Sequence, residues 1–303
     1  MPGGTGGWGA EPSVLIFGDR VEDREAAAAA ARSIGARVIG AEPIEGAVAR
    51  LGRQVAVDSV LIELNGSTTP DWEPLLEWAN VAARERTASP IISMPRALVD
   101  EVWAWVDEPN IALLCDPSPG ERTAALGLAL AGRKLRLHDH GVEADAERLR
   151  RLSEEVGRIA GALAELSSSA RVAPLLTPRE SIEAAGEGQV DANAVRSLIR
   201  IRRLRDQFFS GDLFADPAWD MLLDLFAARL EHSHVAVSSL CIAAAVPPTT
   251  ALRWIRTLTE HGLFVRSADP EDGRRIFIEL SDAAAAALMA YFQTARQMGL
   301  RVS

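Results

Sequence analysis

The sequence has little lysine and cysteine, and each shortage limits what the chain can be. Lys134 is the only lysine beside 31 arginines, which, with the abundant alanine, indicates a GC-rich genome of bacterial type. Cys115 and Cys241 each lie in an apolar run, which argues against a disulfide framework and favours a reducing cytoplasm. No run approaches the roughly 18 apolar residues of a membrane helix, and the start lacks a signal-peptide pattern, so we expect no membrane partner.

What is present is the composition of a globular chain with two domains. The 303 residues are 48% hydrophobic and 24% charged, and the net charge is −10. The acidity is uneven, because residues 195–303 carry 13 arginines and 12 acidic residues, while the rest of the chain has a net charge of −11. This asymmetry predicts two modules with different partners. Only the near-neutral C-terminal module could hold DNA, through arginines clustered on one face.

Residues 13–137 alternate short apolar runs with amphipathic stretches. The expected strands are 13–17, 37–40, 58–64, 90–93 and 111–115, and the expected helices are 22–34, 44–51, 74–86, 96–106 and 121–130. Strands that are each followed by a helix predict an α/β fold with a five-stranded parallel sheet covered on both faces. Chemistry in such sheets belongs at the carboxyl ends of the strands. The residues at those ends are Asp19, Glu63, Ser93 and Asp116.

These landmarks resemble the receiver domain of bacterial response regulators over residues 13–132. In that family acidic residues after the first strand bind magnesium, an aspartate ending the third strand accepts phosphate, a Ser or Thr ends the fourth, and a lysine follows the fifth. Here Gly18 replaces one acid, Glu63 replaces the phosphoacceptor and Asp116 replaces the lysine. An aspartate repels the phosphoryl group that a lysine would neutralise. The resemblance therefore implies a pseudo-receiver that is not phosphorylated and that could receive a regulatory protein partner.

Two questions about these carboxylates stay open in the sequence. Asp19, Glu63 and Asp116 could converge on Mg²⁺ or Ca²⁺, or they could be solvated side chains at a loop rim, which is the interpretation we favour. Glu63 could mimic a phosphoaspartate, or it could be what drift left after phosphorylation was lost. No glycine-rich fingerprint follows the first strand, so we expect no nucleotide cofactor, and we expect no metal.

A heptad pattern predicts a coiled-coil dimerisation helix over residues 138–168. The apolar positions of its seam are Leu149, Leu152, Val156, Ile159, Leu163 and Leu166. An amphipathic helix that lies on its own domain is the alternative. Glycine-rich residues 1–12 are expected to be a flexible tail, and residues 169–190, rich in Ser, Ala, Pro and Gly, a linker.

Residues 191–303 show the pattern of a helix-turn-helix followed by a hairpin. The expected elements are a scaffold helix 217–230, a short helix 240–245, a second helix ending at residue 261, strands 263–266 and 276–280, and a closing helix to residue 292. Ser238 or Ser239 would cap the short helix. Thr249 and Thr250 would cap the second helix, and Gly262 would stop it.

This stretch resembles the winged helix-turn-helix of MarR-type bacterial regulators over residues 217–292. The residues that carry the resemblance are Leu240, Ala244, Thr250, Arg253, Leu258, Glu260-His261-Gly262-Leu263, Arg266 and Asp269-Pro270 through Arg274. The sequence departs from the family at Pro247-Pro248 and at Trp254, where a smaller aliphatic residue is usual. We expect Trp254 to pack in the core, and stacking on a DNA base is the alternative. The resemblance implies an α+β winged domain that binds duplex DNA.

The resemblance also places DNA contacts on the second helix and on the wing. The expected DNA-binding residues are Pro248, Thr249, Thr250, Arg253, Arg256, Asp272, Arg274 and Arg275. Arg253 could pair bidentately with a guanine, or it could contact only phosphate. Arg274 could enter a minor groove, oriented by Asp272, or it could pair with Asp269. Arg275 would bind phosphate.

Upstream of the winged domain, residues 196–205 form the densest basic run of the chain. Its arginines project opposite an apolar helix face, so they could form a phosphate-binding stripe or a solvated face paired with the acidic N-terminal half. The next helix carries Asp220, Asp224 and Glu231, an acidic face that should point away from DNA.

Together these patterns predict a transcriptional regulator of the cytoplasm and nucleoid. It would read duplex DNA as a homodimer, with the recognition helix in the major groove and the wing in the minor groove. The alternative is a protein–protein interaction module, whose pseudo-receiver sequesters a partner and whose winged helix does not read DNA. The acidic total charge favours the alternative, whereas Arg253 and Arg274 favour DNA. No Ser/His/Asp, Cys/His or metal-ligand spacing indicates an enzyme.

Overall fold

The computed structural model describes residues 11–65, 72–138, 190–205, 208, 216–269 and 276–297. The described residues up to Ala131 and those from Val190 onward form one compact unit. We call residues 11–131 the receiver-like module and residues 190–297 the winged-helix module.

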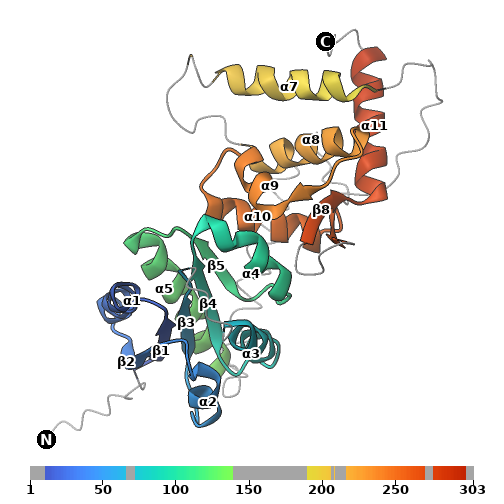
Figure 1. The fold of residues 1–303 in the computed structure, drawn as a ribbon. Coiled ribbons are helices and arrows are strands. Elements are labelled where there is room, and N and C mark those ends of the chain that lie inside the picture. Colours follow the sequence, from blue (N-terminus) through green and yellow to red (C-terminus); the bar gives the residue numbers. More distant parts are fainter. Residues whose placement is uncertain are drawn as a thin grey trace, which may run out of the picture. The chain divides into compact units, whose positions relative to one another are not determined.

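The receiver-like module is a parallel α/β sheet with the predicted alternation. Its elements are β1 (Ser13–Gly18), α1 (Val21–Ser33), β2 (Arg37–Glu42), α2 (Ala47–Gly52), β3 (Ser59–Glu63), α3 (Trp72–Arg84), β4 (Ser89–Met94), the short 3-10 helix η1 (Arg96–Leu98), α4 (Val99–Trp105), β5 (Ala112–Cys115) and α5 (Pro119–His138). The strands pair in parallel in the order β2-β1-β3-β4-β5 (Figure 1). The predicted five-stranded parallel sheet is therefore confirmed.

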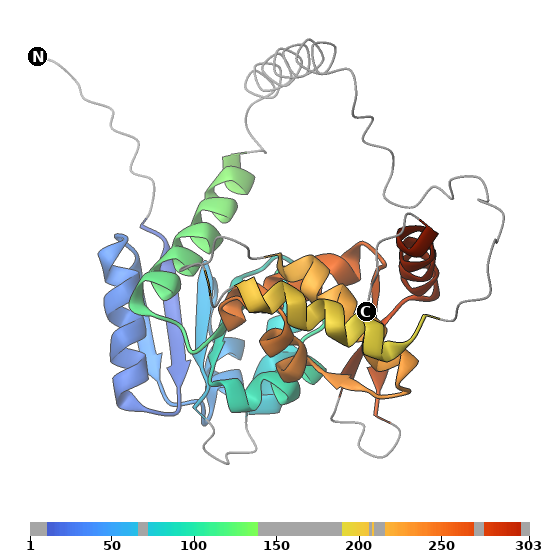
Figure 2. The ribbon, with the colours of Figure 1, turned by 90° about the horizontal axis from the view of Figure 1, so that it is seen from above.

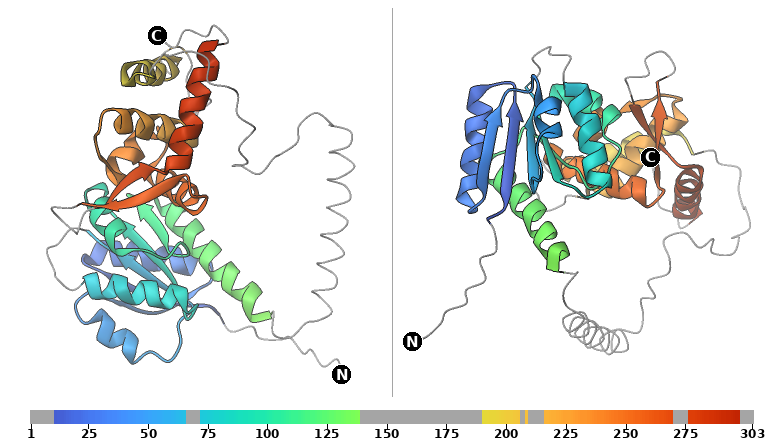
Figure 3. Two further views of the ribbon diagram at one scale, coloured as in Figure 1. Left: turned by 90° about the vertical axis from the view of Figure 1, so that its right-hand side faces the viewer. Right: turned by 90° about the horizontal axis from the view of Figure 1, so that it is seen from below.

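Both faces of this sheet are covered, because side chains along a strand alternate between its two sides. Val14 and Ile16 of β1 pack with α1 and α5, whereas Leu15 and Phe17 pack on the side of α2, α3 and α4 (Figure 3). The sheet ends at β5, which pairs only with β4. One line of β5 backbone N–H and C=O groups therefore needs partners from elsewhere.

The winged-helix module contains the predicted helix pair and wing. Its elements are α7 (Ala192–Leu204), α8 (Pro217–Leu230), β6 (Val235–Ala236), α9 (Val237–Ala243), α10 (Pro248–Glu260), β7 (Phe264–Ala268), β8 (Ile276–Leu280) and α11 (Asp282–Gln297). Strands β6, β8 and β7 form an antiparallel sheet. The helix α7 lies along α8, and α11 runs across both (Figures 1 and 2). The predicted winged helix-turn-helix is confirmed.

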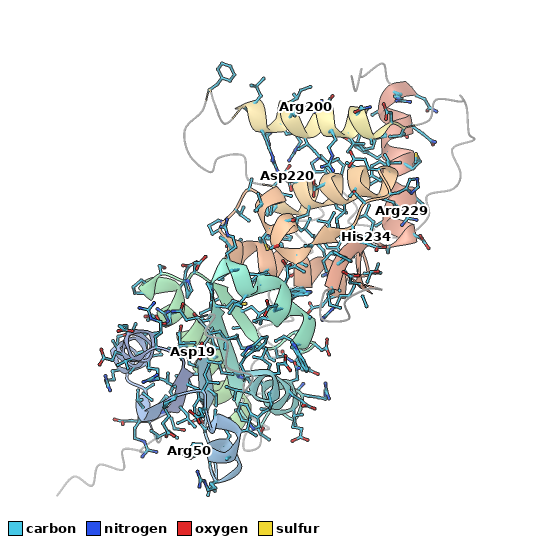
Figure 4. The ribbon with its side chains drawn as sticks, in the orientation of Figure 1. Asp19, Arg50, Arg200, Asp220, Arg229 and His234 are labelled. Carbon is cyan, nitrogen blue, oxygen red and sulfur yellow. The ribbon has the colours of Figure 1, made fainter. Side chains whose placement is uncertain are left out.

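The basic run on α7 is held by the acidic face of α8. Arg196 binds the carboxylates of Asp224 at 2.6 Å and Glu231 at 2.9 Å. Arg202 binds Asp220 at 2.8 Å (Figure 4 labels Asp220 on α8). The hydrogen bond from Arg196 lowers the pKa of Glu231. Arg196 and Arg202 therefore form neither a free phosphate-binding stripe nor a face paired with the acidic N-terminal half. Their guanidinium groups bind carboxylates of α8 instead.

Several predictions fall on residues that the structure does not describe, and they stay predictions. These are the coiled coil with its six seam residues, the tail up to residue 10, the linker up to residue 189, and the wing residues Asp272, Arg274 and Arg275. Among the helices that are described, none combines the length and the apolar character needed to cross a membrane.

The end of the recognition helix α10 offers a test of the backbone. Gly262 has a φ of +69°, and no neighbouring atom lies where a Cβ would stand. Since the left-handed conformation is unfavourable for a residue with a Cβ, Gly262→Ala should lower the free energy of unfolding by about 1–2 kcal/mol. Gly127, inside α5 and also in open space, is the control. Gly127→Ala should raise it by about 0.5–1 kcal/mol. Urea denaturation measures the free energy of unfolding of both variants. If both substitutions change it in the same direction, the left-handed backbone assigned to Gly262 is contradicted.

Candidate functional site

The carboxyl edge of the parallel sheet contains a buried ion pair rather than free carboxylates. Glu63, at the end of β3, is 3% exposed, and Arg122 of α5 is 8% exposed. Arg122 Nε donates to Glu63 Oε1 at 2.7 Å, and Nη2 donates to Oε2 at 3.1 Å. This bidentate geometry occupies both carboxylate oxygens. The interpretation of a solvated carboxylate is therefore wrong for Glu63.

Arg122 is the residue that the sequence analysis missed at this edge. The start of α5 is a capping box, in which the Ser118 N–H donates to Glu121 Oε2 at 2.8 Å and the Glu121 N–H donates to Ser118 Oγ at 3.2 Å. This box fixes the first turn of the helix, and Arg122 follows it directly. A capping box followed by a basic residue was the signal that could have found it. Arg122 thus places a cation directly against the Glu63 carboxylate at this edge.

Two of the other landmark positions lie beside Glu63, because Ser93 is its register partner on β4 and the Asp19 N–H donates to the Glu63 carbonyl at 3.3 Å. Asp19 (labelled in Figure 4) accepts a hydrogen bond from the Asn65 N–H at 3.1 Å. Ser93 is buried at the end of β4, and Asp116 adopts a left-handed backbone with a φ of +46°. In the described part of the chain, no group of three His, Cys, Asp or Glu side chains is arranged to hold a metal. The structure thus gives no support to a cation shared by Asp19, Glu63 and Asp116.

The recognition helix α10 has a core side and an exposed side. Ala251, Leu252, Ile255 and Leu258 are buried in the module. Arg253 is exposed and makes no hydrogen bond or ion pair with any described residue. The expectation that Trp254 packs in the core is wrong, because its side is turned outward and it is 38% exposed. Pro248 and Thr250 are half-buried at the start of the helix.

Two of the predicted DNA-binding residues contact the receiver-like module instead. The Thr249 hydroxyl accepts a hydrogen bond from the Cys115 N–H of β5 at 3.0 Å. Arg256 donates to the backbone carbonyls of Pro109, at 3.1 Å, and of Ile111. Its guanidinium also lies 5.5 Å from the centre of the Trp103 ring. Both residues therefore satisfy or cover the free edge of the sheet at β5.

The expected caps of both helices in the helix-turn-helix are wrong. The helix α9 begins after Ala236 and has no side-chain cap within its own module. Ser238 lies inside the first turn, where its N–H donates to Asp100 Oδ1 at 2.9 Å and its hydroxyl donates to Asp100 Oδ2 at 2.5 Å. Pro247 precedes α10 without capping it, and Thr249 gives its hydroxyl to β5. The cap of α9 thus comes from α4 of the other module.

Arg266 of β7 in the winged-helix module in turn binds the carboxyl end of α4 in the receiver-like module. Its Nη2 donates to the Trp103 carbonyl at 2.6 Å and its Nη1 to the Val106 carbonyl at 3.2 Å. Its Nη1 also lies 3.0 Å from an Asp107 carboxylate oxygen. A cation is favourable at the carboxyl end of a helix, where carbonyls lack partners. We call the surface where α4 and β5 meet α9, α10 and β7 the α4–α10 junction.

Burial at the α4–α10 junction changes the titration of both arginines. The pKa of Arg256 is lowered to about 10, first by desolvation and then by the nearby charge of Arg266. Desolvation also lowers the pKa of Arg266, and the Asp107 carboxylate opposes that effect. Arg256 stays cationic at neutral pH, so the junction buries a charge that contacts backbone carbonyls.

Comparison with known proteins supports the assignment of the C-terminal module. Residues 222–284 match the family described as winged helix DNA-binding domain. This range contains α9, α10, β7 and β8. The chain therefore carries a winged helix DNA-binding domain. No curated protein matches the sequence.

Three solved structures are similar to one part of the chain or another. An uncharacterised protein from Neptuniibacter caesariensis is 15% identical, and the match covers 44% of this chain and 96% of that chain with a TM-score of 0.36. A response regulator receiver domain protein from Clostridium thermocellum is 16% identical, with 41% and 98% covered and a TM-score of 0.34. The S. aureus MepR–DNA complex is 17% identical, with 34% and 78% covered and a TM-score of 0.25.

The buried pair Glu63–Arg122 leads to a stability prediction. Arg122→Met leaves the Glu63 carboxylate buried without its partner, so it should lower the free energy of unfolding by about 3–5 kcal/mol. Adding Glu63→Leu to that variant removes the stranded charge and should recover most of the loss. Arg84→Met, which breaks the exposed pair between Arg84 and Glu108, should cost about 0–1 kcal/mol. Chemical denaturation gives the free energy of unfolding of Arg122→Met, of the double variant and of Arg84→Met. If Arg122→Met and Arg84→Met lose the same amount, the buried ion pair is contradicted.

Proposed function

We propose that the chain is a transcriptional regulator that binds duplex DNA sequence-specifically through α10. The observation that carries this proposal is the exposed Arg253 on the recognition helix of a matched winged helix DNA-binding domain. A guanidinium in that position can donate two hydrogen bonds to a guanine in the major groove. Thr250 and Trp254 flank it, and a threonine methyl group can pack against thymine.

The proposed complex uses the wing as a second contact. With α10 in the major groove, the hairpin of β7 and β8 would extend toward the adjacent minor groove. Arg274, oriented by Asp272, would enter that groove, and Arg275 would bind phosphate. The C-terminal module has the charge for this role, because its arginines offset its acidic residues while the rest of the chain is strongly acidic.

We further propose that the regulator acts as a homodimer. The heptad seam of residues 138–168 supports this, since three aliphatic heptads are typical of a parallel two-stranded coiled coil. Two recognition helices related by a two-fold axis would read a pseudo-palindromic site with half-sites about one helical turn apart.

One observation favours a second candidate function. Thr249 and Arg256, which would face DNA, bind β5 and the residues before it. A winged helix used in this way could be a protein-binding surface, with the receiver-like module as its partner. This candidate predicts no preference among DNA duplexes.

The DNA-reading proposal predicts a sequence-dependent loss for one arginine. Arg253→Ala should weaken binding to a selected duplex by about 1–3 kcal/mol and binding to a scrambled duplex by much less, because a base contact is lost. Arg200→Ala, an exposed arginine on α7, is the matched control and should change neither. Titrations of the full chain on genomic fragments that it selects provide the measurement. If the wild type does not distinguish selected from scrambled duplexes, the second candidate replaces the first.

The dimer proposal is tested by charges in the predicted seam. Leu152→Glu together with Ile159→Glu should shift the full chain from dimer to monomer, because glutamates in an apolar seam oppose association. Glu154→Gln together with Arg158→Gln, at positions outside the seam, should leave the dimer intact. Sedimentation velocity gives the masses. If the variant with Leu152→Glu and Ile159→Glu is still a dimer, the dimer interface lies outside the predicted seam.

A further inference from the structure

We propose that the receiver-like module and DNA compete for the same face of α10, so that the α4–α10 junction must open before the winged helix can read DNA. This inference rests on the proposed DNA-binding function. The proposed opening of the junction needs no phosphorylation of the receiver-like module.

The helix α10 lies along the free edge of β5. Thr249 contacts the carboxyl end of β5 at Cys115, and Arg256 contacts Ile111 just before the strand. The two helix residues are about 10 Å apart along the helix axis, and the two sheet residues are about 13 Å apart along the strand. The two lengths are similar, so α10 lies beside most of β5. The exposed edge of a sheet is commonly protected in this way.

The residues of α10 that contact the β5 edge lie on the same side of the helix as the exposed Arg253, which would enter a major groove. Thr249, Arg253 and Arg256 are spaced four and three residues apart, so they lie on one face of the helix. The buried residues Ala251 and Ile255 project from the opposite side into the module. A recognition helix inserts the face that lies away from its core. The β5 edge and a DNA groove therefore cannot both occupy this face.

Reciprocal caps hold the junction closed. The residue before α9 provides no side-chain cap for the helix. The Asp100 carboxylate of α4 caps it instead, because it accepts hydrogen bonds from both the N–H and the hydroxyl of Ser238. The carboxyl end of α4 receives the guanidinium of Arg266. A charged group at the matching end of a helix is favourable in both cases. Each module thus completes a helix of the other.

The junction also contains donors that it leaves unsatisfied. Arg256 Nη2 and Trp103 Nε1 are buried without a hydrogen-bond partner among the described residues. Leaving a donor buried and unpaired costs free energy, and for a cation the cost is larger. A DNA phosphate would give Arg256 an anionic acceptor, which binds a guanidinium more strongly than a carbonyl does. The closed state is therefore one that DNA can displace.

The two cysteines of the chain report on this junction. Cys115 at the end of β5 and Cys241 on α9 are 2% and 6% exposed. Burial raises the pKa of Cys115 to about 11 and that of Cys241 to about 12, and Cys115 and Asp100 contribute to the shift of Cys241. Closed chains should thus react slowly with a thiol reagent, because the reactive thiolate is scarce and shielded.

The test compares two charge reversals on adjacent residues of α4 in the full chain. Asp100→Arg removes the cap of α9 and places a cation against its amino end, whereas Glu101→Arg makes the same charge change at an exposed position. We expect the cysteines of Asp100→Arg to react at least about tenfold faster with Ellman's reagent. We also expect this variant to bind the selected duplex at least about tenfold more tightly, because a larger fraction of its chains has an open junction and is competent to bind DNA. Glu101→Arg should resemble the wild type in both measurements.

A milder pair serves if Asp100→Arg does not fold. Ser238→Ala removes the hydroxyl that donates to Asp100, and Ser239→Ala changes an exposed neighbour. Ser238→Ala should shift both measurements in the same direction by a smaller factor, and Ser239→Ala should shift neither.

The outcomes separate this inference from the proposed function. If the wild type prefers the selected duplex, and Asp100→Arg exposes the thiols without binding more tightly than Glu101→Arg, competition is overturned and the DNA-binding function stands. If thiol reactivity is unchanged in Asp100→Arg and Ser238→Ala, the junction is not closed by this cap and the inference fails. If the thiols become reactive but no chain prefers any duplex, the proposed function fails.

Discussion

The contact on which the rest of the account depends is the Asp100 carboxylate at the start of α9. A helix leaves its first N–H groups without partners, and α9 begins at Ala236 and Val237, which have no side chain able to cap it. Asp100 satisfies that end from α4. Once this carboxylate is placed, the short chain segment between α9 and α10 brings the recognition helix against β5. The cap of α9 and the bonds of Thr249 and Arg256 together hold α10 against the edge of β5.

The receiver-like module is well suited to be the fixed partner in this contact. The buried pair of Glu63 and Arg122 ties the end of β3 to the first turns of α5. The apolar sheet residues beneath it are fully buried on both faces. The module therefore offers α10 a sheet edge whose own strand, β5, is anchored in a buried core. In the proposed competition, the two states of α10 would differ at the α4–α10 junction, where Arg256 binds backbone carbonyls in the structure and would bind phosphate in the complex.

Much of the fold could be predicted from the sequence, because hydrophobic periodicity and turn chemistry are local. The five parallel strands and the scaffold helix Pro217–Leu230 were expected at or near their observed bounds. The stop at Gly262 was expected as well, and its positive φ explains it. Each of these depends on neighbours within a few residues along the chain.

The contacts that decide the site could not be predicted in the same way, because they join residues far apart in sequence. Ser238 was expected to cap its own helix, but a carboxylate 138 residues away takes its hydrogen bonds. Thr249 and Arg256 were assigned to DNA because a helix surface rich in Thr and Arg is typical of recognition helices. The same donors and acceptors fit the edge of a sheet. A local pattern does not say which of two polar surfaces a polar side chain will meet.

The most direct test of the central claim is amide hydrogen exchange at Cys115 and Ser238, in the free chain and in the presence of saturating selected duplex. Both amides are hydrogen-bonded only across the α4–α10 junction, to Thr249 and to Asp100 respectively, among the contacts described. We predict slow exchange at both amides in the free chain and faster exchange at both amides when DNA is bound. The amide of Ile62, in the centre of the sheet, should stay protected in both samples. Unchanged protection of Cys115 and Ser238 in a chain saturated with DNA would show that the winged helix reads DNA with the junction closed, and would contradict the account.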